Sequence, residues 1–257
     1  MTITAAVLTF LGFLQQGAQA LALRAAPALA VTVSFALIAW GLRSVTISGA
    51  LAGAIVTFIV FVCMGMPGFL AILTLFALTY ISTHLGYPQK QRLGITQEGG
   101  RTGSQVLANL AVAAIACAPS LWFPQSREIL FVGACAALAE AAADTVSSEV
   151  GQAFRTQAYL ITDLRPVPTG QNGGISVAGT IAGVGAAAII AFACLWMDLI
   201  ALRWVGLVLL AGTLGMLFDS FLGATLERPG RLGNDSVNFS STAFAAFVAI
   251  LISFLLS

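Results

Sequence analysis

The chain has 257 residues, of which 59% are hydrophobic and only 8% are charged, and its net charge is +1. Soluble domains carry about 25% charged residues, so this composition excludes an ordinary soluble domain. The near-neutral balance also provides no global field that would attract nucleic acid. The apolar residues come in long runs, which differ from the short alternating strands of an outer-membrane barrel and favour membrane-spanning helices.

A transmembrane helix needs about 20 largely apolar residues, and nine segments of the sequence approach that length. The first is interrupted by Gln15, Gln16 and Gln19, so a helix lying along the membrane surface is an alternative there. Gly-Met-Pro-Gly at 65–68 predicts a tight turn between two spans. We therefore predict an all-α fold, a polytopic bundle of about seven to nine transmembrane helices that forms one integral membrane domain over residues 1–257. The candidate spans are 4–22, 25–42, 45–64, 67–83, 104–122, 127–143, 174–197, 201–218 and 238–256.

Three longer polar segments separate these spans, at 84–103, 144–173 and 219–237. If all nine spans cross the membrane, the three segments lie on the same face, which then carries eight of the 11 basic residues. Positive residues accumulate on the cytoplasmic side, so we predict cytoplasmic polar loops, an N-terminus inside and a C-terminus outside. The basic residues of that face are Arg43, Lys90, Arg92, Arg101, Arg155, Arg165, Arg228 and Arg231.

Carboxylates lie where two apolar runs end. Glu140 and Asp144 are four residues apart and share a helix face that Ser148 extends, while Glu149 follows closely and Asp219 ends a later run. Ionisable groups at membrane depth are costly and usually functional. A set of carboxylates suits Mg²⁺, which prefers one or two of them together with phosphate oxygens and water. The alternative is that these groups are solvated at the interface or paired with arginines.

A glycine-rich segment, 166-PVPTGQNGGISVAGT-180, leads into an apolar run. Backbone N–H groups in such a loop, and at the start of the helix beyond it, favour bound anions. The segment has neither the GxGxxG nor the Walker spacing, so a plain turn is the alternative.

Two further polar groups precede apolar runs. Arg101 comes before Gln105 and Asn109, which are four apart and share a helix face. A cation there holds phosphate, pairs with lipid head groups or simply sets topology. Asn234 and Asn238 stand before the last span, where a helix cap accounts for only one of them.

Four ordered motifs run through these segments: 99-GGRTGSQVLAN-109, 143-ADTVSSEVG-151, 168-PTGQNGGISVAGT-180 and 218-FDSFLGATLE-227. They resemble the signatures of the phytyl-phosphate kinase family, which groups bacterial and archaeal membrane proteins with the animal transmembrane protein 19. The resemblance covers nearly the whole chain. It implies an enzyme that transfers a phosphoryl group from CTP or another nucleoside triphosphate to an isoprenyl monophosphate, with Mg²⁺. In photosynthetic members the substrate is phytyl phosphate, which feeds tocopherol or phylloquinone synthesis.

The resemblance, together with the polar residues described above, predicts roles for individual residues. The predicted catalytic residues are Asp144, Asp219 and Arg101, and the predicted metal ligands are Asp144, Glu149 and Asp219. The residues expected to bind nucleotide or lipid phosphate are Gln105, Asn109, Ser148, Arg165, Gly173, Gly174, Ser176, Ser220, Asn234 and Asn238.

Two other functions stay open at this point. One is a cytidylyltransferase that forms a CDP-linked lipid, and the other is a secondary transporter, although transporters place their sites near the bilayer midplane. The expected partners are an isoprenyl phosphate lipid, a nucleoside triphosphate and membrane lipids, with no nucleic acid and with a homodimer as the candidate assembly. The expected location is a bacterial cytoplasmic or thylakoid-type membrane.

Overall fold

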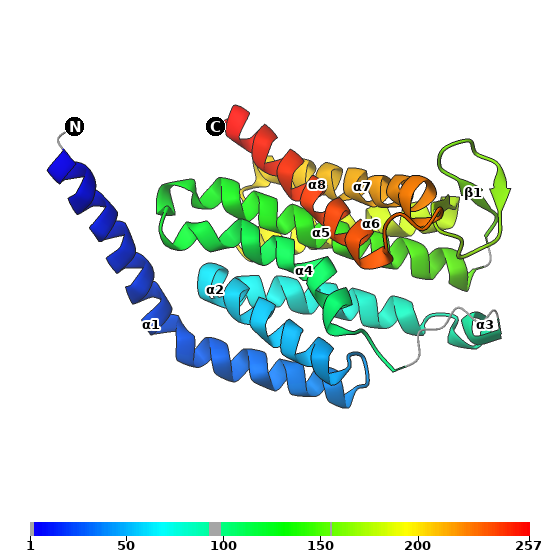
Figure 1. The fold of residues 1–257 in the computed structure, drawn as a ribbon, viewed down its shortest axis with the longest axis horizontal. Coiled ribbons are helices and arrows are strands. Elements are labelled where there is room, and N and C mark those ends of the chain that lie inside the picture. Colours follow the sequence, from blue (N-terminus) through cyan, green and yellow to red (C-terminus); the bar gives the residue numbers. More distant parts are fainter. Residues whose placement is uncertain (1–2, 93–98, 155) are drawn as a thin grey trace.

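The computed structural model describes residues 3–92, 99–154 and 156–257. Within these residues, seven helices are long and apolar enough to cross a membrane, which confirms the predicted all-α polytopic class. The helices form a bundle from which the first part of the chain extends (Figure 1). Residues 93–98 of the predicted loop 84–103, and Arg155 of the predicted loop 144–173, lie outside the described residues.

The helices are named in chain order. They are α1 (Ile3–Gly41), α2 (Ile47–His84), the short α3 (Tyr87–Arg92), α4 (Gly103–Cys117), α5 (Arg127–Ala153), α6 (Val177–Trp196), α7 (Leu202–Leu222) and α8 (Asn234–Leu255). Short 3₁₀ turns, Ala118–Leu121 and Pro124–Ser126, connect α4 to α5, and a π-helical turn, Gly223–Glu227, extends α7. Three short antiparallel strands lie between α5 and α6 in the order β2-β1-β3, namely β1 (Ala158–Leu160), β2 (Pro166–Val167) and β3 (Gly174–Ile175).

Helix α5 is the centre of the bundle and contacts α2, α4, α6, α7 and α8. In its hydrophobic 18-residue stretch, 83% of the residues are buried, a larger share than in any other spanning helix of the described part of the chain. Small residues let membrane helices approach closely. A Cβ atom on Gly183 of α6 would lie 2.8 Å from the carbonyl oxygen of Ala143, and one on Gly212 of α7 would lie 2.9 Å from the Cβ of Ala139. Glycine at these positions therefore brings α6 and α7 against α5.

Helix α2 reverses direction at Gly65, where φ is 71° and ψ is −162°. Its two arms run antiparallel (Figure 1), which confirms the turn predicted at 65–68. Carbonyl groups at a helix end lack donors within the helix. Here the guanidinium of Arg24 donates to the carbonyl oxygens of Val62 and Cys63, at 2.9 and 3.2 Å.

Helix α1 is one continuous helix, so the prediction of two separate spans at 4–22 and 25–42 is wrong. The side chain of Arg24 reaches the α2 turn, and Pro27 is accommodated within the helix. One fewer crossing changes the position of the N-terminus. The described start of α1 and the end of α8 lie at the end of the bundle opposite the polar loops (Figure 1), so the predicted placement of the two termini on opposite sides is also wrong.

Two of the segments predicted as polar loops, 144–173 and 219–237, are helical in part. Helix α5 continues to Ala153, the π-helical turn after α7 continues to Glu227, and α8 begins at Asn234. Polar residues of these segments such as Asp144, Ser148 and Asp219 line a cavity between the helices, so their polarity does not mark the end of a helix. The small sheet within 158–175 was not predicted, because strands of two or three residues leave no periodic signal.

Candidate functional site

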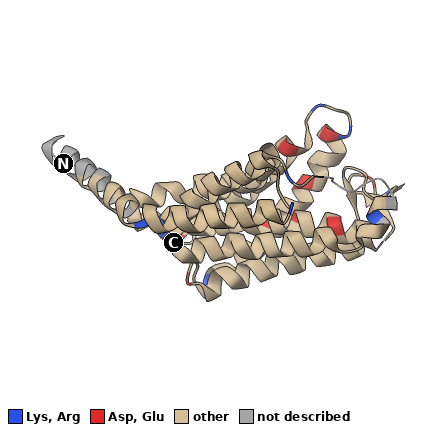
Figure 2. Cartoon of the chain, turned by 90° about the horizontal axis from the view of Figure 1, so that it is seen from below, with Lys and Arg blue, Asp and Glu red and all other residues tan. Residues whose placement is uncertain are grey.

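A polar cavity of about 290 Å³ lies at the end of the bundle opposite both termini. Figure 2 shows that most acidic residues gather toward this end. The cavity is lined by Arg101 and the start of α4, the last turns of α5, residues 169–174 and Ser176, the end of α7 with its π-helical turn, and the start of α8. These segments are far apart in the sequence, and the helix packing brings them together.

Every residue of the predicted site except Arg165 lines this polar cavity. Arg165 instead pairs with Asp163 across 3.2 Å, and the two side chains are 58% and 49% exposed. The turn between β1 and β2 carries this pair on the surface. The position of Arg165 therefore does not support the prediction that it binds substrate. It lies in the short connection between β1 and β2, outside the polar cavity.

Helix direction gives the polar cavity its electrostatic character. Helices α4, α6 and α8 begin beside it, and helices α5 and α7 end beside it. Helix N-termini carry partial positive charge and point N–H groups outward, so three of them favour an anion here. Ser176 caps α6 by accepting from the backbone N–H of Gly179 at 3.1 Å, and the Gln105 side chain accepts from the N–H of Thr102 at 2.9 Å to complete the cap of α4.

The carboxylates come from the two helices that end at the polar cavity. Asp144 on α5 and Asp219 on α7 both line it, and the hydroxyl of Ser241 donates to Oδ2 of Asp219 at 3.0 Å. Glu140 lies one turn deeper on α5, is 1% exposed and packs against Gly215 of α7. Asp144 and Ser148 of the predicted α5 stripe thus reach the cavity, whereas Glu140 is buried beneath it.

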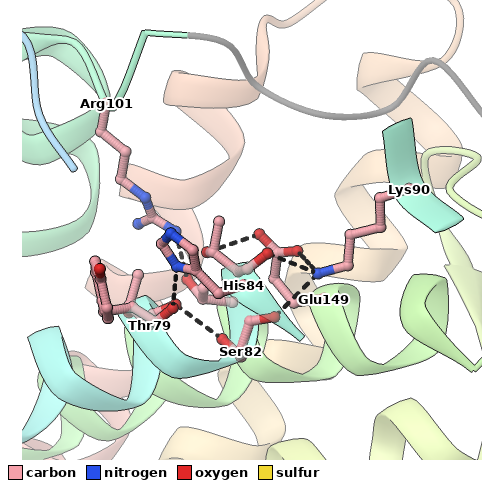
Figure 3. A network of polar contacts seen from close by, with 9 residues as sticks. Thr79, Ser82, His84, Lys90, Arg101 and Glu149 are labelled. Atoms are coloured by element: carbon pink, nitrogen blue, oxygen red, sulfur yellow. Dashed lines mark hydrogen bonds and ion pairs between the residues drawn. The ribbon is translucent and has the colours of Figure 1, made fainter. Parts of the chain in front are cut away.

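Glu149 lines the polar cavity, yet both of its carboxylate oxygens are engaged (Figure 3). The ammonium of Lys90 donates to Oε2 at 2.5 Å, and the hydroxyl of Thr83 donates to Oε1 at 2.9 Å. Among the described residues, no group of three His, Cys, Asp or Glu side chains is close enough to hold one metal ion. The predicted ligand set of Asp144, Glu149 and Asp219 is thus not assembled around a single point. Of these three carboxylates, only Glu149 forms a salt bridge with a described residue.

Backbone pairing with the start of α2 holds Arg101 in place. Its N–H donates to the carbonyl oxygen of Ser44 at 2.9 Å, and its carbonyl oxygen accepts from the N–H of Thr46 at 3.0 Å. The guanidinium points to the hydroxyl of Thr145 at 3.4 Å. Burial lowers the pKa of the Arg101 guanidinium, and the charges of Glu149 and Asp144 oppose that shift. A cation therefore stands beside carboxylates at the wall of the cavity.

The glycine loop packs against the end of α7. Gly173 has φ of 77°, and a Cβ atom there would collide with the backbone of Ala224 in the π-helical turn. A Cβ on Gly223 would in turn lie 2.9 Å from the backbone nitrogen of Gly173. The N–H of Gly174 donates within the loop, to Gln171 at 2.9 Å. The N–H of Gly174 is therefore already used within the loop.

Sequence reasoning assigned no role to some residues that line the polar cavity, among them Glu227, Gln152, Thr156 and Thr169. Glu227 follows Asp219 by about two helical turns. That spacing would have signalled a shared helix face, but the segment was predicted to be a loop. A π-helical turn, which is frequent at functional sites, gives this part of α7 its conformation.

Comparison with known proteins places these features in a family context. A family model described as "Integral membrane protein DUF92" matches residues 30–246, a range that contains every residue of the predicted site. A membrane protein of Synechocystis sp. is 32% identical over 196 residues, which are 75% of this chain and 76% of that protein. Protein VTE6, chloroplastic, of Arabidopsis thaliana is 28% identical over 195 residues, which are 73% of this chain and 59% of that protein. Protein PGR of Arabidopsis thaliana is 32% identical over 260 residues, covering 82% of this chain and 90% of that protein. No solved structure matches the chain.

Proposed function

Because the chain belongs to the DUF92 family of integral membrane proteins, we propose that it is a membrane-embedded kinase of prenyl phosphates. Its acceptor would be an isoprenyl monophosphate, phytyl phosphate or a related lipid, and its donor CTP or another nucleoside triphosphate. The products would be the lipid diphosphate and the nucleoside diphosphate. The family membership confirms the resemblance drawn from the four motifs, and the similarity to protein VTE6 supports the kinase assignment.

One observation carries this proposal: Arg101, Asp144 and Asp219 line a single polar cavity onto which three helix N-termini open. Phosphoryl transfer requires mainly positioning and neutralisation of charge around the phosphates. A cation and helix N-termini provide attraction for phosphate oxygens, and the nearby carboxylates provide sites for a cation that accompanies the nucleotide. The cavity lies at the end of an apolar bundle, where a water-soluble donor can meet a lipid acceptor.

The reaction needs no strong base from the protein. An oxygen of the lipid monophosphate is already anionic at neutral pH and would attack the γ-phosphorus of the donor. The bond from that phosphorus to the β–γ bridging oxygen would break, and the nucleoside diphosphate would leave with the electron pair. Arg101 would neutralise charge on the transferring group, and Gln105, Asn109 and Asn238 would orient phosphate or ribose oxygens.

The donor set of the polar cavity fits Mg²⁺ bound together with a nucleotide. Mg²⁺ usually takes one or two carboxylates and completes its coordination with phosphate oxygens and water. Asp144 and Asp219 supply two carboxylates, and the hydroxyls of Ser148 and Ser220 line the same cavity. When bound, the ion would neutralise charge on the donor phosphates. Glu149, which Lys90 engages, would support the cavity wall instead of acting as a ligand.

The proposed use of a nucleotide also predicts how the protein is oriented in the membrane. The polar cavity would face the cytoplasm of a bacterial or thylakoid-type membrane, where nucleotide is available. The basic residues of the loops at this end agree with the usual excess of positive charge on the cytoplasmic side. The concentration of acidic residues toward one end of the bundle (Figure 2) also disfavours a midplane transport site.

Product analysis tests the proposal directly. Purified protein in detergent or nanodiscs is incubated with Mg²⁺, a prenyl monophosphate and CTP or ATP labelled in the α- or γ-position. The expected result is release of nucleoside diphosphate and transfer of the γ-label to lipid. Release of pyrophosphate with the α-label in the lipid would instead establish cytidylyl transfer. Substrate uptake by proteoliposomes without either product would establish a transporter.

A further inference from the structure

A second cavity, of about 740 Å³, lies beside the polar cavity, between α1, the two arms of α2 and the start of α4. We call it the apolar cavity. Its walls are mainly aliphatic and aromatic, with Phe35 and Ala39 from α1, Ile72, Leu75 and Phe76 from α2, and Val106 from α4. Binding pockets for small molecules are typically apolar spaces of about 300–1,000 Å³ with a few polar groups. Neither the motifs nor the proposed chemistry assigns a function to this space.

The two cavities share part of their walls. Arg101, Asn109, Glu149 and Gln152 line both of them. Figure 3 shows Arg101 and Lys90 approaching Glu149 from different sides at this junction. A ligand that bridges the two cavities would therefore have its polar part beside Arg101 and the remainder of its length among the apolar residues.

The charges of the apolar cavity are confined to one end. Arg43, Arg101 and the Lys90–Glu149 ion pair line it near the polar loops, together with His84, so Arg43 and Arg101 are the cations without an acidic partner in the described salt bridges. Farther in, the walls contain small or apolar residues such as Gly53 and Ile72. The space thus suits an amphipathic anion with a single charged end. A nucleotide would leave the apolar part unmatched, and a neutral lipid would leave the cations unmatched.

From this arrangement we infer that the apolar cavity holds the hydrocarbon chain of the acceptor lipid and that its depth selects the chain length. The inference rests on the proposed function and specifies where its substrate lies: the phosphate beside Arg101, and the prenyl chain between the arms of α2. Helices α1 and α2 would then serve as the specificity element, while α5 and α7 carry the carboxylates.

Buried hydroxyl groups offer a way to test the nature of the occupant. Thr57 and Thr79 line the apolar cavity, and their hydroxyl oxygens have no hydrogen-bond partner among the described residues. Buried polar groups normally have partners. Both oxygens are covered by neighbouring side chains, so a ligand with polar atoms along its length would bond to them only by displacing those side chains, and a hydrocarbon chain would leave them covered. Thr57→Val removes a hydroxyl with little change of shape, so it should leave KM for a prenyl phosphate unchanged if the chain lies there.

Gly53 provides the substitution that shortens the cavity. A Cβ atom at Gly53 would have only the Cγ1 of Val106 nearby, at 3.9 Å, so a leucine side chain would extend into the free space. Gly185 on α6 is the matched control, because it is exposed and a Cβ there would have nothing within 4 Å. We expect Gly53→Leu to raise KM for phytyl phosphate about tenfold or more while geranyl phosphate is little affected. Gly185→Leu should leave both values unchanged.

The experiment has two arms that separate this inference from the proposed function. In the first, wild type, Gly53→Leu, Gly53→Ala, Gly185→Leu and Thr57→Val are assayed with geranyl, farnesyl and phytyl phosphates after thermal unfolding has shown that each is folded. In the second, wild-type protein is photolabelled with a prenyl phosphate that carries a diazirine at the end of its chain, and labelled peptides are identified by mass spectrometry. Labelling needs no turnover, and the expected sites lie in α1 and the arms of α2.

Absence of turnover with every prenyl phosphate would refute the proposed function while leaving the labelling result intact. Normal turnover with labels confined to the outer face of α6 or α8 would refute the position inferred for the prenyl chain and leave the proposed function intact. Equal loss of activity toward all chain lengths in folded Gly53→Leu, or a tenfold higher KM in Thr57→Val, would also overturn the inference.

Discussion

The ammonium of Lys90 lies 2.5 Å from a carboxylate oxygen of Glu149, at the wall between the polar and the apolar cavity (Figure 3). Lys90 comes from the short helix α3 and Glu149 from the last turns of α5, so the pair joins the loop after α2 to the centre of the bundle. Lys90 is 2% exposed and also donates to the carbonyl oxygens of Ser82 and Thr83. The contact therefore has a structural role that the sequence motif around Glu149 did not indicate.

Lys90→Met should destabilise the protein by about 3 kcal/mol, since removing one partner of a buried ion pair leaves the other charge uncompensated. The value is at the lower end of the usual range because the Glu149 side chain is 21% exposed. Thermal or denaturant unfolding in detergent measures the change. The exposed ion pair of Arg165 and Asp163 provides the control: Arg165→Met should lower the free energy of unfolding by at most about 1 kcal/mol.

The double variant Lys90→Met/Glu149→Gln should recover part of the lost stability, because the unpaired charge is gone. If the single and double variants unfold alike, the ion pair does not account for the stability of this region.

Asp144→Asn should lower kcat by a factor of about 10² or more while the protein stays folded, because a neutral amide cannot replace a carboxylate in holding the cation that accompanies the nucleotide. Asp163→Asn is the control, since Asp163 is exposed and lies outside the polar cavity. Turnover with labelled nucleotide at several Mg²⁺ concentrations measures the effect. Wild-type activity in Asp144→Asn would remove that residue from the site.

Arg101→Lys should lower kcat/KM about tenfold or more even though the charge is kept. Lysine lacks the planar fork with which arginine contacts phosphate oxygens. The backbone pairing of residue 101 with Ser44 and Thr46 involves main-chain atoms only, so the fold should be preserved. Arg165→Lys is the control and should leave kcat/KM unchanged. Equal effects at the two positions would contradict the positions that the structure assigns to them.

Gly173→Ala should raise KM for the nucleotide, because a Cβ atom there collides with the backbone of Ala224 and pushes the glycine loop away from α7. Gly230→Ala is a close control: Gly230 has nearly the same φ, 76°, but a Cβ there meets nothing within 4 Å. Both variants should lose about 1–2 kcal/mol of stability from the left-handed backbone. Only Gly173→Ala should change nucleotide binding, as measured by titration or by KM; an equal change in both would mean that backbone strain alone is responsible.

Much of the candidate site could be predicted from the sequence. Asp144, Asp219, Arg101 and Asn238 were recognised because polar residues at the ends of apolar runs are costly in a membrane and are retained for a reason. The same rule was misleading about helix boundaries. It treated 144–153 as loop, although a helix can carry polar residues inward when a cavity receives them.

The ion-pair partners of Arg165 and Glu149 could not be predicted in this way. Both are charged residues close to a motif, and the sequence contains nothing that separates them from Asp144. The sheet turns Arg165 toward Asp163 at the surface, and α3 presents Lys90 to Glu149. The contact between Lys90 and Glu149 joins segments that are 59 residues apart, so it follows only from how the elements pack.

The sequence by itself determined that this protein lies in a membrane, that it belongs to one family of integral membrane proteins, and most of the residues that line its polar cavity. Those properties are local, because the bilayer acts on each segment according to its own hydropathy and length. The tertiary structure alone decided that the motifs meet at one polar cavity, that α2 folds back at Gly65, and that an apolar cavity adjoins the site. The physical reason is that side-chain volumes on neighbouring helices, above all the small residues around α5, set which segments touch, and no segment contains that information alone.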